Sequence, residues 1–93
     1  MNFEWDEAKN KSNRQKHGIW FEEAKSVFED DFAKVFYDES TSTVEKRFLI
    51  IGNNASGDNL IVVHCYREND EVIRIISARR TTKKERLIYE EGI

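Results

Sequence analysis

The stretch that decides the fold is residues 47–79, RFLIIGNNASGDNLIVVHCYRENDEVIRIISAR. It contains three apolar runs rich in β-branched and aromatic residues, RFLII (47–51), LIVVHCY (60–66) and VIRIISA (72–78). Clusters of Gly, Asn, Asp and Ser separate the runs, which is typical of strands joined by tight turns. Together with FAKVFY (32–37), the pattern predicts four consecutive strands that pair as an antiparallel meander.

Helical patterns precede these strands. Asp6 can cap a helix that runs to about Lys16 and stops at Gly18. A second helix is predicted from apolar residues at three- and four-residue spacing, namely Phe21, Ala24, Val27 and Phe28.

A further helix is predicted after the last strand. Thr81 or Thr82 can cap it, and Glu85 stands at capping-box distance from Thr82. The predicted fold is therefore α+β, with two N-terminal helices, a four-stranded antiparallel meander sheet and a C-terminal helix. Residues 1–93 are expected to form a single domain, because 93 residues leave no room for a second core and no linker divides them.

Composition excludes several classes of protein. Six Phe, three Tyr and two Trp are too many for a disordered chain. No run approaches the roughly 20 apolar residues of a membrane span. The N-terminal MNFEWDEAKNK is no signal peptide, so a cytoplasmic protein without membrane contact is expected. The single Cys65 excludes an internal disulfide and a cysteine-rich zinc site, and no glycine-rich phosphate loop occurs, so neither metal nor cofactor is expected.

Charge is segregated along the chain, although its net value is only -3. Residues 20–45 are strongly acidic. The basic side chains gather in residues 74–86, as Arg74, Arg79, Arg80, Lys83, Lys84 and Arg86. A local basic patch can bind a polyanion whatever the net charge of the protein. A solvated helix face gives the same pattern, so composition leaves both interpretations open.

Three arginines fall where a purely structural strand would carry apolar residues. Arg74 interrupts a predicted strand, Arg79 follows the same strand and Arg47 opens another. A buried charge is costly unless it is paired or placed in a site. The three guanidiniums can form a phosphate cage that stabilises a pentacovalent phosphorane. Equally open are ion pairs with acidic residues such as Glu4, Asp6 and Glu45.

The last hairpin predicts which side chains share a face of the sheet. With residues 69–70 as its two-residue turn, cross-strand counting places Arg79 on the side of Tyr66 and His64. The same counting places Arg74 on the opposite side. A single β-bulge would change this allocation.

His17 and Tyr66 each allow two interpretations. His17 ends the first predicted helix, where an imidazole can act as a general acid or base, or can simply complement the helix macrodipole. Tyr66 can stack on a nucleobase or can belong to the core. The residues alone do not decide between these roles.

Three motifs in register resemble the BrnT family of toxins. They are WDxxKxxxNxxKHGIxFxxA (5–24), ExRxxxIG (45–52) and RIISAR (74–79), the last followed by Glu85 and Tyr89. Each motif alone is weak, but the three follow one another in order over essentially the whole chain. The chain departs from the family pattern at Asp58 and Asn59, where the family often carries an Arg before its next strand.

The resemblance implies a RelE-like ribonuclease fold and the toxin half of a type II toxin–antitoxin pair. It implies metal-independent RNA cleavage, in which the ribose 2′-hydroxyl attacks the adjacent phosphate and leaves a cyclic phosphate end. Translation would be inhibited and growth arrested. The implied partners are RNA, free or on the ribosome, and a BrnA-like ribbon-helix-helix antitoxin. Two toxins would sit on an antitoxin dimer, and operator DNA would be bound only through the antitoxin.

The resemblance also implies roles for single residues. Arg74 and Arg79 would stabilise the phosphate, with Arg47 in the same role, while His17 or Lys9 would transfer protons. Glu45 is a reserve base. The residues expected to bind RNA around this centre are Tyr66, Arg80, Lys83 and Lys84. The alternative function is a non-catalytic module that binds an antitoxin and acts as co-repressor with this DNA-binding partner.

Overall fold

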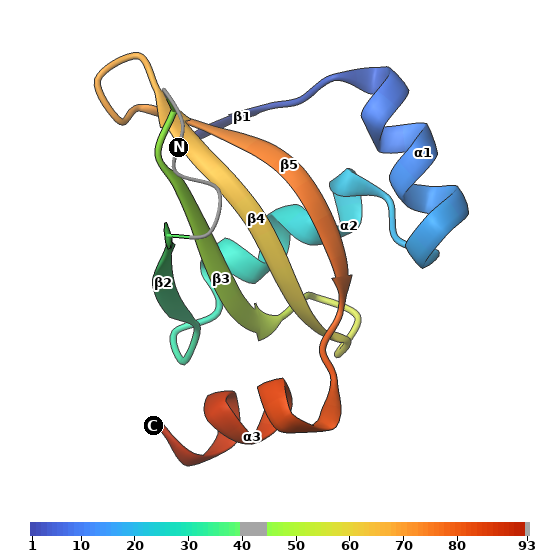
Figure 1. The fold of residues 1–93 in the computed structure, drawn as a ribbon, viewed down its shortest axis with the longest axis vertical. Coiled ribbons are helices and arrows are strands. Elements are labelled where there is room, and N and C mark those ends of the chain that lie inside the picture. Colours follow the sequence, from blue (N-terminus) through green and yellow to red (C-terminus); the bar gives the residue numbers. More distant parts are fainter. Residues whose placement is uncertain (40–44, 93) are drawn as a thin grey trace.

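A computed structural model describes residues 1–39 and 45–92, which form an α+β fold (Figure 1). Its elements are β1 (Asn2–Glu4), α1 (Glu7–His17), α2 (Phe21–Ala24), the 3₁₀ helix η1 (Lys25–Glu29), β2 (Lys34–Asp38), β3 (Arg47–Asn53), β4 (Asn59–Arg67), β5 (Val72–Arg80) and α3 (Lys83–Glu91). From α1 onward, the predicted order of two helices, four strands and a helix is confirmed. The second predicted helix is a single α-helical turn that continues as 3₁₀ helix.

The strands form one sheet in the order β1-β5-β4-β3-β2. Strands β2 to β5 pair antiparallel with their neighbours in the chain, which confirms the meander. The prediction of four strands is wrong at the N-terminal end. There β1 adds a fifth strand that runs parallel to β5, with Asn2 opposite Val72 and Glu4 opposite Arg74.

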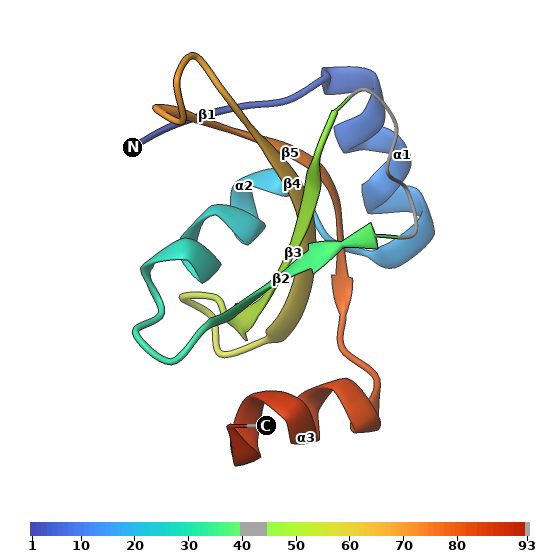
Figure 2. The same ribbon diagram turned by 60° about the vertical axis from the view of Figure 1, so that its left-hand side comes forward.

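The hydrophobic core lies on one face of the sheet, beneath α2 and η1. In Figure 2 the α2–η1 segment and α1 lie on opposite sides of the sheet. The core contains buried side chains from the helical segment and the strands, chiefly Ile19, Phe21, Ala24, Val27, Ile50, Leu60, Val62, Ile73, Ile75 and Ala78. Because apolar burial stabilises by about 25 cal/mol per Å², this face holds the fold together.

Helix α1 is joined to the sheet by buried amide side chains instead of an apolar stripe. The Asn13 amide donates to the carbonyl oxygens of Ile19 and Ala78, at 2.9 and 2.8 Å, and accepts from the Ala78 N–H at 3.1 Å. Ala78 lies beyond the part of β5 that pairs with β1, so Asn13 satisfies an otherwise open strand edge. Asn10 accepts from the Phe21 N–H at 2.7 Å and ties α1 to α2.

The predicted helix ends are confirmed. The Asp6 carboxylate accepts from the Ala8 N–H at 2.8 Å, and Gly18 ends α1 with a φ of 74°, a conformation that favours glycine. Thr82 and Glu85 form the capping box of α3. Within the described ranges, no helix is long and apolar enough to cross a membrane.

Strand β5 contains a β-bulge near its middle. His64 pairs with Ile75, as cross-strand counting predicts, but the next pair joins Val63 to Ser77. Ile76 is therefore an extra residue on β5. The alternation of side chains between the two faces is shifted by one residue beyond this point.

The bulge corrects the predicted placement of Arg79. Arg79 pairs with Ile61, which lies on the face opposite to Tyr66 and His64. It therefore shares a face with Arg74 and not with Tyr66. The Cα atoms of the two arginines are still about 15 Å apart along the strand, at about 3.3 Å per residue, and the guanidiniums donate to different carboxylates, Glu4 and Glu85.

Candidate functional site

A cleft of about 290 Å³ lies between α1, the start of β3 and the bulge of β5. Its lining residues are Lys9, Ser12, Asn13, Lys16, His17, Arg47, Ile76 and Ser77. They include two lysines, an arginine and a histidine but no carboxylate. Because basic side chains line the cleft and no carboxylate does, the cleft is suited to an anion although the whole chain is acidic.

The residues of α1 that line the cleft recur at regular intervals in the sequence. These five residues, at positions 9, 12, 13, 16 and 17, are separated by three and four residues and so lie on one face of α1. Two of the predicted site residues, Lys9 and His17, are on this face and are exposed. Sequence reasoning missed Ser12 and Lys16, which the same helical period would have found.

Arg47 lies on the sheet side of the cleft and is the first residue of β3. Its Nε–H is buried, and within residues 1–39 and 45–92 it has no hydrogen-bond acceptor and Arg47 forms no ion pair. A buried donor left without an acceptor costs about 1–3 kcal/mol. Such a group is normally retained for a reason other than stability.

The structure does not bring Arg74 and Glu45 into this cleft. The Arg74 guanidinium donates to Glu4 at 2.8 Å, which is one of the ion pairs left open by the sequence. Arg67 approaches the same Glu4 carboxylate at 3.6 Å and Glu45 at 2.7 Å. Arg74 and Glu45 therefore belong to one chain of charges at the β1 end of the sheet.

Arg79 is also engaged by a carboxylate. Its two terminal nitrogens donate to the two oxygens of Glu85, at 2.8 and 2.9 Å. The hydrogen bonds from Arg79, with a further one from the Thr82 N–H, lower the pKa of Glu85 to about 2. Of the three predicted arginines, Arg47 alone lines the cleft.

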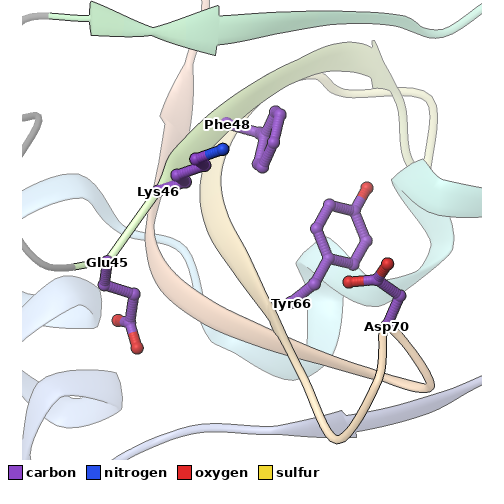
Figure 3. Close-up of a pocket in the computed structure, with 5 residues that line it drawn as sticks. All are labelled: Glu45, Lys46, Phe48, Tyr66 and Asp70. Carbon is purple, nitrogen blue, oxygen red and sulfur yellow. The ribbon is translucent and has the colours of Figure 1, made fainter.

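Tyr66 lies in a second cleft, on the core side of the sheet. This cleft of about 500 Å³ is lined by Glu45, Lys46, Phe48, Tyr66 and Asp70 (Figure 3). The Tyr66 hydroxyl is 3.3 Å from Nε2 of His64, a fully buried ring whose pKa is lowered by burial. Although this cleft is larger, its two carboxylates make it the poorer site for a polyanion. Tyr66 is not part of the α1 cleft.

The remaining predicted RNA-binding residues are exposed at the end of β5 and the start of α3. Lys83 and Lys84 occupy the first turn of α3, and Arg80 forms an ion pair with Asp58 at 3.7 Å. The Arg80 guanidinium also approaches Gly18, the residue after His17, because a Cβ on Gly18 would lie 3.7 Å from its Nη1. Arg80 therefore lies at the His17 end of the α1 cleft.

Comparison with known proteins identifies the family. The profile described as the ribonuclease toxin, BrnT, of type II toxin–antitoxin systems matches residues 5–85. The chain belongs to the BrnT family. The crystal structure of the Brucella abortus ribonuclease toxin BrnT is similar to this fold, with a TM-score of 0.67 and 26% sequence identity over 89% of this chain and 99% of that one. A search of the curated proteins gives no match.

Membership in the BrnT family agrees with the placement of the matched motifs. The first motif contains Lys9, Asn13, Lys16 and His17, and all four line the α1 cleft. Among the described residues, no group of three or more His, Cys, Asp and Glu side chains is arranged to hold a metal ion. The α1 cleft is therefore the candidate site of this BrnT-family chain, with Arg47 on the sheet and Lys9 and His17 on the helix.

Proposed function

We propose that this protein is a ribonuclease toxin that cleaves RNA in the α1 cleft without a metal ion, by attack of the ribose 2′-hydroxyl. The observation that supports this site is the set of cations lining the cleft, with no carboxylate among them. An RNA backbone brings one negative charge per phosphate, which such a lining attracts. Family membership supplies the class of reaction.

In the proposed reaction the 2′-oxygen forms a bond to phosphorus and the bond to the 5′-oxygen breaks. A base takes the proton of the 2′-hydroxyl, and an acid gives a proton to the departing 5′-oxygen. Lys9, Lys16 and His17 are the side chains on the helix side of the cleft that can transfer protons, and we assign the two transfers to His17 and Lys9. The products are a 2′,3′-cyclic phosphate and a free 5′-hydroxyl, with no net change in protons.

Arg47 stabilises the phosphorane in this proposal. The reacting phosphate gains negative charge on its non-bridging oxygens, and a guanidinium held by a strand is a preorganised donor for them. Arg47 suits this role better than Arg74 and Arg79, whose guanidiniums already donate to Glu4 and Glu85. Arg74 and Arg79 are then assigned to contacts with the RNA on either side of the cleft.

Flanking phosphates would follow the basic residues beyond His17. Arg80 lies beside Gly18, and Lys83 and Lys84 extend from the first turn of α3. Cations placed in this way bind the backbone without reading the bases. Tyr66 lies on the other side of the sheet, so we assign it no contact at the reacting phosphate.

The biological context proposed here follows from the family. The toxin would inhibit translation and arrest growth, acting on free or ribosome-associated RNA in the cytoplasm. A BrnA-like ribbon-helix-helix antitoxin would neutralise it, with two toxins on an antitoxin dimer and operator DNA contacted by the antitoxin alone. The net negative charge of this chain agrees with the assignment of DNA binding to the antitoxin.

The test is RNA cleavage by purified protein, freed of antitoxin, in excess EDTA. Total RNA and translating ribosomes serve as substrates, with Arg47→Ala as the site variant and Arg86→Ala as a matched control. Arg86 pairs with Glu90 on α3 and does not line the α1 cleft. We expect cyclic phosphate ends from the wild type and the control, and none from Arg47→Ala. Protein that binds its antitoxin but cleaves neither substrate would instead be a non-catalytic co-repressor module.

A further inference from the structure

Among residues 1–39 and 45–92, no strand lies beside the outer edge of β2. β2 is the last strand of the sheet, and it is paired on one side only, to β3 (Figure 1). Its outward backbone N–H and C=O groups can therefore pair with a strand from another chain. The five residues of this edge are KVFYD, from Lys34 to Asp38.

The middle of this edge is apolar and exposed. Val35, Phe36 and Tyr37 have exposed fractions of 52%, 37% and 45%, and Phe32 just before the strand reaches 74%. Natural edge strands are usually protected from association by proline, a bulge or a charge in the strand centre. β2 has none of these between its two terminal residues, so its composition favours a partner strand.

The sequence of β2 is complementary to itself. When two copies run antiparallel with Phe36 opposite Phe36, Lys34 of each copy lies opposite Asp38 of the other, and Val35 lies opposite Tyr37. Opposite charges and aromatic with β-branched residues are favourable cross-strand pairs. Both pairs occur twice, because the arrangement has two-fold symmetry.

Other registers lose this match. An in-register parallel pair places Lys34 against Lys34 and Asp38 against Asp38, which is destabilising. An antiparallel pair centred on Val35 places Lys34 opposite Phe36 and Asp38 opposite Phe32, so neither charge meets an opposite charge. The register centred on Phe36 therefore matches charge and side-chain type at all positions of the strand.

We propose that the free protein forms a homodimer by antiparallel pairing of β2 with β2 of a second copy, centred on Phe36. The two sheets then continue into one another across the two-fold axis, and the exposed side chains of Val35 and Tyr37 become covered. This interface shares no residue with the lining of the α1 cleft. Dimer formation can therefore be tested independently of RNA cleavage.

The first test uses charge reversal and sedimentation equilibrium over a range of protein concentrations. Lys34→Asp places two aspartates opposite each other at both ends of the paired strands, and Asp38→Lys places two lysines there. Each variant alone is expected to raise the dimer dissociation constant by about tenfold. An equal mixture of the two variants restores both opposite-charge pairs in the heterodimer, and its dissociation constant should return to the wild-type value.

The mixture also separates the interface from a folding defect, because a misfolded variant would not recover on mixing. Circular dichroism and thermal unfolding of each variant provide the matching control. A wild type that stays monomeric at all concentrations overturns the proposal. A dimer that is unchanged by both variants, or a mixture that does not recover, overturns it as well.

The second test fixes the register with cysteines. Directly opposed residues of antiparallel strands have Cα atoms about 4.5–5.5 Å apart, within the range of a disulfide. Phe36→Cys should therefore give a disulfide-linked dimer under mild oxidation. Val35→Cys should not, since Val35 lies opposite Tyr37. The native Cys65 is fully buried and provides a low background. Cross-linking through position 35 in place of position 36 would contradict the register.

Discussion

Arg79 and Glu85 are joined by two hydrogen bonds, from Nη1 to Oε1 at 2.8 Å and from Nη2 to Oε2 at 2.9 Å. The same carboxylate accepts from the Thr82 N–H at 2.8 Å and so takes part in the cap of α3. Glu85 thus connects the end of β5 to the first turn of the last helix. This relationship accounts for the strongly lowered pKa of Glu85.

The first prediction concerns the acid stability of the protein. The pKa of Glu85 falls from its ordinary 4.5 to about 2 in the folded chain, so its stabilising contribution is complete above pH 4.5 and disappears as the pH falls toward 2. Glu85→Gln should remove this part of the pH dependence. It should also lower the free energy of unfolding at pH 7 by about 1–2 kcal/mol. Urea unfolding of both proteins between pH 2 and pH 7 measures the difference, and parallel curves would contradict the assignment.

The second prediction compares the arginines of the sheet. Arg47→Ala should reduce the rate of RNA cleavage by about 100-fold or more, as removal of a preorganised donor to a transition state typically does. Arg74→Ala should have a smaller effect, and it should lower stability by at most about 1 kcal/mol through loss of the partly exposed ion pair to Glu4. Single-turnover cleavage rates and thermal unfolding distinguish the two. Equal losses of rate would remove the special role of Arg47.

The third prediction concerns the attachment of α1. Asn13→Ala removes the side-chain partners of the Ile19 carbonyl and of both backbone groups of Ala78. Because these groups are buried, Asn13→Ala should lower the free energy of unfolding by about 3 kcal/mol. Gln15→Ala, an exposed change on the same helix, should stay within about 0.5 kcal/mol of the wild type. The midpoints of denaturant unfolding measure the stability of the two variants. Similar midpoints for Asn13→Ala and Gln15→Ala would refute the role of Asn13.

The fourth prediction concerns the docking of α3. The Tyr89 hydroxyl donates to Asp30 at 2.7 Å, and this hydrogen bond raises the pKa of Tyr89 to about 12. The neutral phenol is thus favoured in the folded chain, so stability should fall as the pH rises from 10 toward 12. Tyr89→Phe should cost about 1 kcal/mol at neutral pH and should lose this alkaline dependence. Thermal unfolding at pH 7 and pH 11 provides the check, with Tyr37→Phe as the control tyrosine.

Much of the fold was predictable because its signals are local. Asp6, Gly18 and Thr82 define helix ends because their side chains or backbone conformations cap the helices. The apolar runs that become β2 to β5 are bounded by residues typical of turns. The register of the last hairpin also follows its prediction, since Tyr66 pairs with Ile73, although Glu68 as well as Asn69 and Asp70 adopts positive φ. The ends of helices and the order of neighbouring strands therefore need no tertiary information.

The features that sequence reasoning missed depend on contacts between distant residues. β1 is only three residues long and is a strand because β5 lies beside it. The bulge at Ile76 has no signature in an apolar run, yet it decides the face of Arg79. The ionic partners of the arginines also depend on contacts between residues that are distant in the sequence. Glu4 and Arg74 are 70 residues apart, so their pairing had to remain one of several alternatives.

The buried amide of Asn13, which bonds to the edge of β5 across 65 residues, has a consequence for the biosynthesis of the protein. A nascent chain on the ribosome cannot complete the wall of the α1 cleft until Ala78 has left the exit tunnel. Until then α1 has no strand edge to bind, and Lys9 and His17 lie on a helix that is marginal by itself at this length. The proposed cleavage site is therefore assembled only after β5 has been synthesised and has left the ribosome.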